Sequence, residues 1–232
     1  MDNKLVYDRQ VIEDERKLLP EHQQVLKWVG HNKKVLEVGC HTGYFSSALK
    51  SRNCEVVGIE IYEPALKKAE QYLVKGILGN IESEHVWNEV SAFKFDVILF
   101  MHVLEHLVAP ETVLEKFKTL LNPGGIVVIC LPNINNWVNR YEIAKGGFNY
   151  TEFGVMDKTH LKFYNYFSAK QFIESTGLKV FEYSGVSSKV RFKVMPDRWL
   201  MAINNVYNSI IHKILGPNIT DKVIMYKAVQ QS

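Results

Sequence analysis

The sequence predicts an α/β protein in which helices cover both faces of a mostly parallel sheet. Short apolar runs alternate with amphipathic stretches from residue 34 onward, the pattern of strand–helix–strand units. The run FDVILFM (95–101) is apolar except at Asp96, which is typical of a parallel strand buried on both faces. A chain of 232 residues, 47% hydrophobic and 23% charged, is long enough for one such domain with a substantial core.

The periodicity assigns each element a range. The helix over 64–73 has Pro64 in its first turn, and the helix over 111–121 is expected to end at the Asn-Pro-Gly-Gly sequence 122–125. Further helices are predicted over 45–52 and 168–177. Strands are predicted at KVLEVG (34–39), EVVGIE (55–60), GILGN (76–80), FDVILFM (95–101), IVVICLP (126–132), LKVFEYSGV (178–186) and DKVIMYKAVQ (221–230).

Three other segments elaborate this single domain, which we expect to span 1–232. Residues 1–30 form a helical N-terminal extension. Residues 134–167 hold 9 of the 27 aromatic residues, a density that favours a substrate lid between the fifth and sixth strands. Residues 194–216 contain an amphipathic helix whose polar face carries asparagines rather than cations, so we expect it to pack on the sheet or in a homodimer, not on anionic lipid.

Composition excludes several classes of protein. The net charge of +3 and the lack of a basic run argue against a nucleic-acid partner. The three cysteines lie in or beside apolar runs and are expected to be buried thiols. The N-terminus shows no signal peptide, and no segment has the length of a membrane span, so we expect a cytoplasmic protein without stable membrane insertion.

A glycine-containing turn follows the first strand in VLEVGCHTGYF (35–45). Such a turn lets a ligand approach the backbone, and the free amides of the next helix favour negative charge. Glu60 ends the following strand, where a carboxylate can accept hydrogen bonds from both hydroxyls of a ribose. Together these features favour a cofactor that contains a nucleoside, although Glu60 could also be an ordinary solvated strand end.

Five segments in order resemble the class I S-adenosylmethionine-dependent methyltransferases: VLEVGCHTGYF, VVGIE, GNIE (79–82), FDVILFMHVLEHL (95–107) and LNPGGIVVICLPN (121–133). The resemblance implies a Rossmann-like, doubly wound, seven-stranded sheet whose last strand is antiparallel. It implies S-adenosylmethionine as cofactor and S-adenosylhomocysteine as product. The cofactor-binding positions that it implies are Glu37, Gly39, His41, Gly43, Glu60, Ile61, Asn80, Ile81, Met101 and His102.

Two of these positions depart from the family pattern. His41 stands where relatives usually have glycine, and its imidazole adds bulk beside the cofactor. Asn80 stands where aspartate is common, but it keeps an acceptor oxygen for the adenine amino group. If His41 compromises the turn, the chain could bind a nucleotide without turnover.

The string MHVLEH (101–106) also matches H-x-x-E-H, a zinc peptidase pattern. A zinc peptidase would place both histidines in one long helix and would need a further ligand downstream. In the resembled family the same string marks the junction after the fourth strand. We therefore predict that the protein holds no metal and that His106 lines the pocket or packs beside it.

The acceptor side is predicted from TEFGVMDKTHLKFYNYFS (151–168). Its DKTHLKFY stretch resembles a segment of bacterial methyltransferases associated with polysaccharide biosynthesis. We expect His160 to be the general base, with Asp157 orienting it or binding acceptor hydroxyls, and His106 as a further catalytic candidate. Trp137, Tyr141 and Tyr150 could stack on the acceptor or form a small core of the lid. The expected reaction is O-methylation of a sugar or glycan-linked molecule; the alternative acceptor is a lipid-like or natural-product small molecule.

Overall fold

A computed structural model describes residues 18–187, 210 and 212–231 of the chain. Its seven-stranded sheet has the order β3-β2-β1-β4-β5-β7-β6. Strands β1 to β5 pair in parallel, whereas β7 is antiparallel to both of its neighbours. This confirms the predicted sheet. The strands are β1 (Lys34–Val38), β2 (Glu55–Glu60), β3 (Lys75–Leu78), β4 (Phe95–Met101), β5 (Leu121–Pro132), β6 (Leu178–Ser187) and β7 (Asp221–Gln230).

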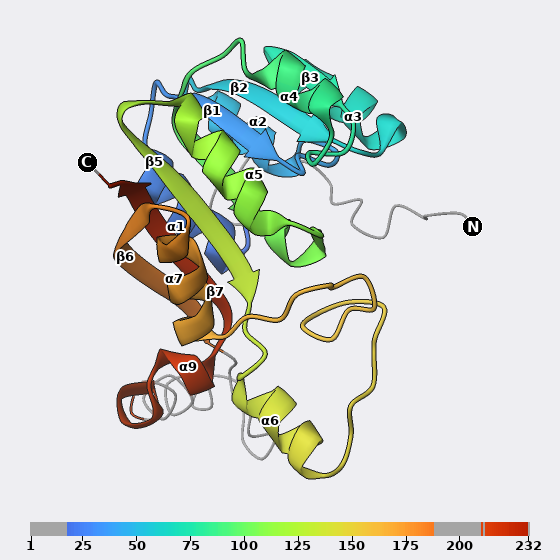
Figure 1. The fold of residues 1–232 in the computed structure, drawn as a ribbon, viewed down its shortest axis with the longest axis vertical. Helices are drawn as coiled ribbons and strands as arrows, with labels where there is room; N and C mark the ends of the chain where they lie inside the picture. Colours follow the sequence, from blue (N-terminus) through green and yellow to red (C-terminus); the bar gives the residue numbers. More distant parts are fainter. Residues whose placement is uncertain (1–17, 188–209, 211, 232) are drawn as a thin grey trace, which may run out of the picture.

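Helices cover both faces of the sheet (Figure 1). One hydrophobic cluster joins one face to α4, α5 and α7, and a second joins the other face to α1 and α2. The three helices of the first cluster are α4 (Glu84–Val90), α5 (Pro110–Phe117) and α7 (Tyr166–Ser175). The remaining helices are α1 (Pro20–Val29), α2 (Tyr44–Ser51), α3 (Glu63–Ala69), α6 (Trp137–Ala144) and α9 (Pro217–Thr220), with short 3-10 turns at Glu70–Tyr72, Leu104–His106 and Lys118–Leu120.

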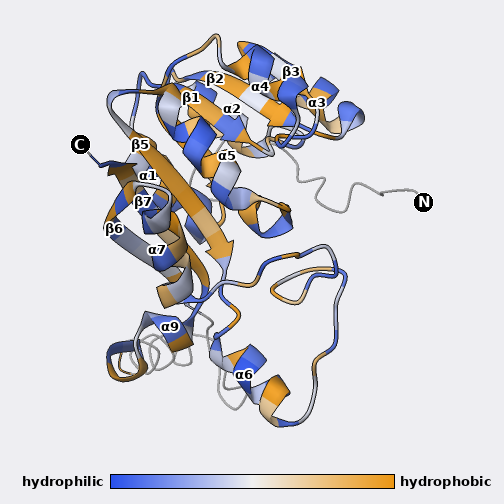
Figure 2. Ribbon diagram, in the orientation of Figure 1, coloured by the Kyte–Doolittle hydropathy of each residue, from blue (hydrophilic) through white to orange (hydrophobic). Residues whose placement is uncertain are grey.

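The central strands are apolar because both of their faces are buried. In β4, Val97 and Leu99 pack on the α1–α2 side, while Ile98 and Phe100 pack on the α4–α5–α7 side. Successive side chains of a strand point to opposite faces, so only a continuous apolar run can fill both clusters. Figure 2 shows the same hydrophobic colouring along most of β5.

Two boundaries differ from the sequence prediction. The predicted helix over 111–121 ends at Phe117, and the Asn-Pro-Gly-Gly sequence belongs to the start of β5 rather than to the helix end. There Phe95 pairs with Leu121 but Val97 pairs with Ile126, so the extra residues form an irregularity in the sheet. Helix α4 was not predicted because it is short; its Ser83 cap accepts a 3.4 Å hydrogen bond from the Val86 amide.

The structure describes parts of the three predicted segments outside the core of the domain: 1–30, 134–167 and 194–216. Helix α1 lies within the N-terminal extension, and α6 lies within the lid. The helix predicted over 194–216 falls mostly outside the described residues; among those described, 210 and 212–215 are helical. No helix in the described ranges is long and apolar enough to cross a membrane.

Candidate active site

The carboxyl ends of the parallel strands meet at one edge of the sheet, and the predicted site residues follow them. Val38 pairs with Phe100, so β1 and β4 end side by side. The turn after β1 also touches the segment after β4, since a Cβ added to Gly39 would lie 2.9 Å from Cγ2 of Val103. In open α/β sheets this edge is where ligands bind.

The glycine turn after β1 has little room for side chains. Gly39 and Gly43 have φ angles of 70° and 79°, in the left-handed region that favours glycine. A Cβ at Gly43 would lie 2.7 Å from Cδ2 of Tyr72 and 2.9 Å from Cα of Ala69. The turn therefore packs directly against the end of α3 and leads into α2 at Tyr44.

Glu60, at the end of β2, is held beside this turn by three backbone amides. Its Oε2 accepts a 2.9 Å hydrogen bond from the His41 amide, and its Oε1 accepts 2.9 Å bonds from the amides of Ile61 and Tyr62. The side chain is buried, with 7% exposed. These bonds fix the carboxylate at the edge of the sheet and leave part of its acceptor capacity for a ligand hydroxyl.

The backbone at His41 has a conformation that favours glycine. Its φ is 47°, which costs a residue with a side chain about 1–2 kcal/mol. The chain nevertheless keeps the turn, because the His41 amide is tied to Glu60. A histidine at this position is therefore compatible with the turn geometry.

Two further polar groups lie in this part of the site. Glu37 on β1 accepts a 2.6 Å hydrogen bond from Oγ of Ser46. Burial, with a smaller contribution from the charge of Glu60, raises the pKa of Glu37 to about 8 despite that bond. Thr42, in the turn, is 4% exposed, and its Oγ1 has no hydrogen-bond partner among the residues described. The motifs did not single out Thr42. The signal that could have found it is its place between the two turn glycines.

The predicted adenine-side residues divide into two groups. Ile61 is 69% exposed beside Glu60, as expected of a residue that packs on a flat ring. Ile81, by contrast, is 7% exposed and belongs to the hydrophobic core, so its side chain is not available at the adenine edge. Asn80 Oδ1 accepts a 2.9 Å hydrogen bond from the Glu82 amide, so only its remaining acceptor capacity is available to adenine.

The MHVLEH segment does not have the geometry of a zinc peptidase. Strand β4 ends at Met101, His102 follows with a left-handed φ of 57°, and Leu104–His106 form a 3-10 turn. His102 and His106 are therefore not one turn apart in a continuous helix, as that motif requires. The His102 amide is bonded to the Cys130 carbonyl at 3.0 Å, which places the residue between the ends of β4 and β5.

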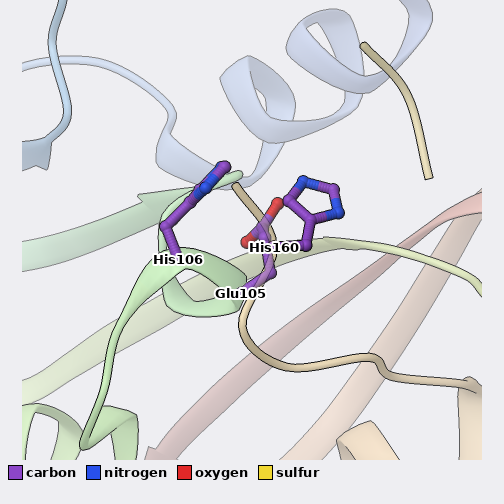
Figure 3. Close-up of side chains that lie close together, drawn as sticks. All are labelled: Glu105, His106 and His160. Atoms are coloured by element: carbon purple, nitrogen blue, oxygen red, sulfur yellow. The ribbon is translucent and has the colours of Figure 1, made fainter. Parts of the chain in front are cut away.

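Two histidines, His106 and His160, lie together beside this segment. The rings of His106 and His160 have their centroids 4.7 Å apart and lie nearly edge to face. Glu105 lies with them: one potential ligand atom from each of the three residues falls within 4.8 Å of the others. Figure 3 shows the Glu105 carboxylate between the two imidazoles. The fold has thus brought the two main predicted catalytic histidines into one cluster, together with a glutamate that was not predicted.

The Asp157 carboxylate, which was expected to orient His160 or to bind acceptor hydroxyls, is hydrogen-bonded to Thr159. Its Oδ1 accepts hydrogen bonds from the amide (2.8 Å) and the hydroxyl (2.7 Å) of Thr159. Burial alone would raise the pKa of Asp157, but these bonds and the nearby His160 and His106 hold that pKa below its usual range. His160 is oriented instead by the carbonyl of Val155, 3.0 Å from its Nδ1.

The lid aromatics are mostly exposed. Tyr141, Phe148 and Tyr150 are each 57% exposed, whereas Trp137, at the start of α6, is partly buried. Phe148 and Tyr150 contact each other edge to face, with centroids 6.0 Å apart. Figure 1 shows α6 and the following loop beyond the carboxyl end of β5, away from the sheet. The exposed side chains do not form a small core of the lid, so their faces are available to an acceptor.

Comparison with known proteins identifies the family. A family model described as a methyltransferase domain matches residues 7–183. A ubiquinone biosynthesis O-methyltransferase from Azoarcus sp. (strain BH72) is 30% identical over 70% of this chain and 73% of its own length. Another, from Psychrobacter arcticus, is 32% identical over 50% of this chain and 47% of its own length. The chain thus spans between about half and three quarters of these curated relatives.

The fold comparison agrees. A SAM-dependent methyltransferase of known structure from Archaeoglobus fulgidus superimposes with a TM-score of 0.60 at 17% identity, covering 90% of each chain. The chain therefore belongs to the class I S-adenosylmethionine-dependent methyltransferases. The predicted fold class, enzyme class and cofactor are confirmed at this level.

Proposed function

We propose that this enzyme transfers the methyl group of S-adenosylmethionine to a hydroxyl oxygen of a lipid-like or aromatic small molecule. The observation that carries the proposal is the contact between Gly39 and Val103. It joins the cofactor turn to the segment that ends in Glu105 and His106. A sulfonium bound at the turn would thus lie next to imidazoles that can receive a proton.

The cofactor is held by residues from the ends of two strands, β1 and β2. Glu60 binds the ribose hydroxyls, Ile61 packs on the adenine, and the turn from Gly39 to Gly43 surrounds the methionine part. Thr42 supplies a buried hydroxyl without a partner in the described chain, suited to the methionine carboxylate. Glu37, buried below the turn, is suited to the methionine ammonium group, whose positive charge would favour the ionised carboxylate.

The transfer needs a base but no other reactant. A lone pair of the acceptor oxygen forms the new O–CH3 bond as the CH3–S bond breaks, and the sulfur leaves as the neutral thioether of S-adenosylhomocysteine. The hydroxyl proton goes to Nε2 of His160, because Nδ1 already contacts the Val155 carbonyl and must carry the ring hydrogen. Positioning of the acceptor along the S–CH3 axis supplies much of the remaining rate.

The relatives support this acceptor class over the first expectation of a sugar. Both relatives above are named O-methyltransferases of ubiquinone biosynthesis. Ubiquinone is a lipid-soluble aromatic-derived molecule, so these names support the lipid-like alternative and an oxygen acceptor. The exposed faces of Tyr141 and Tyr150 suit a planar ring. A sugar remains the comparison compound in any screen.

Titration calorimetry with S-adenosylmethionine tests the cofactor half of the proposal. Glu60→Ala should lose roughly 1.5–3 kcal/mol of binding free energy, because a charge-assisted contact to ribose is removed. Glu63→Ala is the matched control, since Glu63 is an exposed residue three positions away that pairs with Lys67. Equal affinities of Glu60→Ala and the parent would disprove the ribose assignment.

A turnover screen tests the acceptor half. Catechols, hydroxylated prenyl-aromatic compounds and nucleotide sugars should be supplied with cofactor labelled in the methyl group. We expect label in the phenolic compounds, recovered as methyl ethers. Methylation of sugars alone would overturn the proposed acceptor class, and binding of cofactor without any methyl transfer would support the non-enzymatic alternative.

A further inference from the structure

Glu105 is a buried carboxylic side chain that accepts no hydrogen bond from the described residues. Its residue is 0% exposed, and neither carboxylate oxygen has a hydrogen-bond partner among the residues described. The nearest basic group is Nδ1 of His102, at 3.5 Å from Oε1. Burying an ionised carboxylate without hydrogen bonds is costly, so such a group is kept only where something else compensates it.

The two imidazoles beside Glu105 are oriented as metal ligands are. Nδ1 of His160 lies 3.0 Å from the Val155 carbonyl, and Nδ1 of His106 lies 3.2 Å from the Thr159 carbonyl. A carbonyl can only accept, so both rings carry their hydrogen on Nδ1 and leave the Nε2 lone pair free. Metal-binding histidines characteristically donate their second ring N–H to a backbone carbonyl or a carboxylate.

The Thr159 residue that contacts His106 is itself held by a hydrogen bond to Asp157. The hydroxyl of Thr159 also lies 3.1 Å from Nδ1 of His106, and it donates to Asp157 at 2.7 Å. Asp157 therefore acts as a positioning residue for the segment that contacts His106. This chain of contacts gives a physical reason for the buried aspartate that does not require contact with the acceptor.

We propose that Glu105, His106 and His160 bind a divalent transition-metal ion through one carboxylate oxygen and two Nε2 atoms. One potential ligand atom from each of these residues already lies within 4.8 Å of the others. Metal–ligand distances of about 2.0–2.2 Å require only a modest contraction of the cluster, which side-chain rotation supplies. Two imidazoles with one carboxylate favour zinc, cobalt, manganese or iron(II) over magnesium and calcium, which prefer oxygen ligands.

Three protein ligands leave at least one coordination position open, as in catalytic zinc sites. An acceptor hydroxyl that occupied this position would lose its proton to water more readily, because the cation stabilises the alkoxide or phenoxide. His160 would then hold the cation instead of receiving the proton. This role rests on the proposed function, whereas binding of the cation does not. The inference departs from the sequence-based expectation of no metal, which treated the histidines as separate.

Cobalt(II) is the probe, because it both binds and reports its ligands. Untagged full-length protein, stripped with a chelator, should be titrated with cobalt chloride in a calorimeter and followed by visible absorption. We expect one equivalent to bind with the absorption of nitrogen and oxygen ligands. Glu105→Gln and His160→Gln should each weaken binding at least tenfold. Magnesium should bind far more weakly than cobalt or zinc.

The control variant is His85→Gln, which removes a surface histidine whose Nε2 pairs with Glu89 at 3.1 Å. It should bind cobalt like the parent, whereas equal effects of all three variants would show adventitious surface binding and overturn the proposal. The proposal would also be overturned if cobalt did not bind the parent protein, or if it bound Glu105→Gln and His160→Gln as tightly as the parent.

Two further readouts separate this inference from the proposed function and from misfolding. Cofactor affinity, measured on the same metal-free samples, should be unchanged in all variants. Cobalt should raise the melting temperature of the parent protein but not that of Glu105→Gln, because binding to the folded state stabilises it only where the ligand set is intact. A melting temperature that still rises with cobalt in Glu105→Gln would contradict the assignment of that ligand.

Discussion

The cofactor side and the acceptor side of this enzyme are built in different ways. Around the glycine turn, Glu37, Thr42 and Glu60 are all buried, and a single carboxylate ties together three backbone amides. In the lid, Tyr141 and Tyr150 are more than half exposed. One half is a close-packed part of the sheet edge, and the other is a loosely covered extension of it.

This difference explains why sequence motifs predict the cofactor but not the acceptor. Side chains in the close-packed half are constrained by several neighbours at once, so the same cofactor requires the same local sequence. The lid satisfies few such constraints and can vary with the acceptor. The cofactor is therefore readable from motifs, whereas the acceptor is not. The predictions below test where the boundary between the halves lies.

The largest effect is expected on turnover, at His160, where we place the acceptor beside the cofactor. His160→Ala should lower turnover by about 10²–10⁴-fold, the range for losing a positioned general base, while cofactor affinity stays unchanged. Single-turnover rates with saturating cofactor are the measurement, and His85→Ala serves as control. Full activity of His160→Ala would show that His160 does not receive the acceptor proton.

The next largest effect is the pH dependence of stability caused by Glu37 on the cofactor side. Its pKa of about 8 in the folded protein exceeds the ordinary value of 4.5, so the folded state binds a proton more tightly than the unfolded chain. Stability should therefore fall as pH rises from about 5 to 8, by roughly 1.4 kcal/mol per pH unit from this group, and level off above 8. Glu37→Gln should lose this slope.

Urea unfolding at a series of pH values measures the Glu37 effect. The difference in unfolding free energy between the parent and Glu37→Gln isolates this group, because the other titrating residues are shared. Glu55→Gln, on an exposed strand end, should keep the slope of the parent. Parallel pH profiles of the parent and Glu37→Gln would show that Glu37 is ionised in the fold.

A smaller effect is expected in the glycine turn. Gly43→Ala and Gly124→Ala both place a side chain at nearly the same φ, 79° and 77°. At Gly43 the Cβ also meets Tyr72 and Ala69, whereas at Gly124 nothing lies within 4 Å. Gly43→Ala should thus destabilise the protein by about 1–3 kcal/mol more than Gly124→Ala, and it alone should weaken cofactor binding. Equal losses of stability would mean that the turn is not tightly packed.

The smallest effect on stability is expected in the lid. Tyr150→Ala should change the free energy of unfolding by less than about 0.5 kcal/mol, since the side chain is mostly exposed. It should raise KM for the acceptor several-fold without changing cofactor affinity. Phe181→Ala, which truncates a comparably exposed ring on β6, is the control and should leave KM unchanged. An unaltered KM in Tyr150→Ala would remove this residue from the acceptor surface.

The sequence by itself determined the sheet and the cofactor turn. Apolar runs such as the VILF part (97–100) of FDVILFM are sufficient because a strand needs apolar side chains wherever both of its faces are buried. Gly43 and Glu60 are equally local, since each acts through its own position next to a strand end. The misplaced boundary at Asn122–Gly125 shows the limit of local signals: a Pro-Gly-Gly sequence also fits an irregular strand start.

Only the tertiary structure decided the chemistry at the acceptor side. His106 and His160 are far apart in the sequence, and their contact depends on the path by which the lid returns to the sheet. The burial of Glu105 and Ile81 likewise depends on what packs over them, which no spacing records. Sequence patterns report the neighbours that a residue has along the chain. A site assembled from distant segments depends on contacts between residues that are far apart in the sequence. Its burial, charges and hydrogen bonds can therefore be assigned only from the tertiary structure.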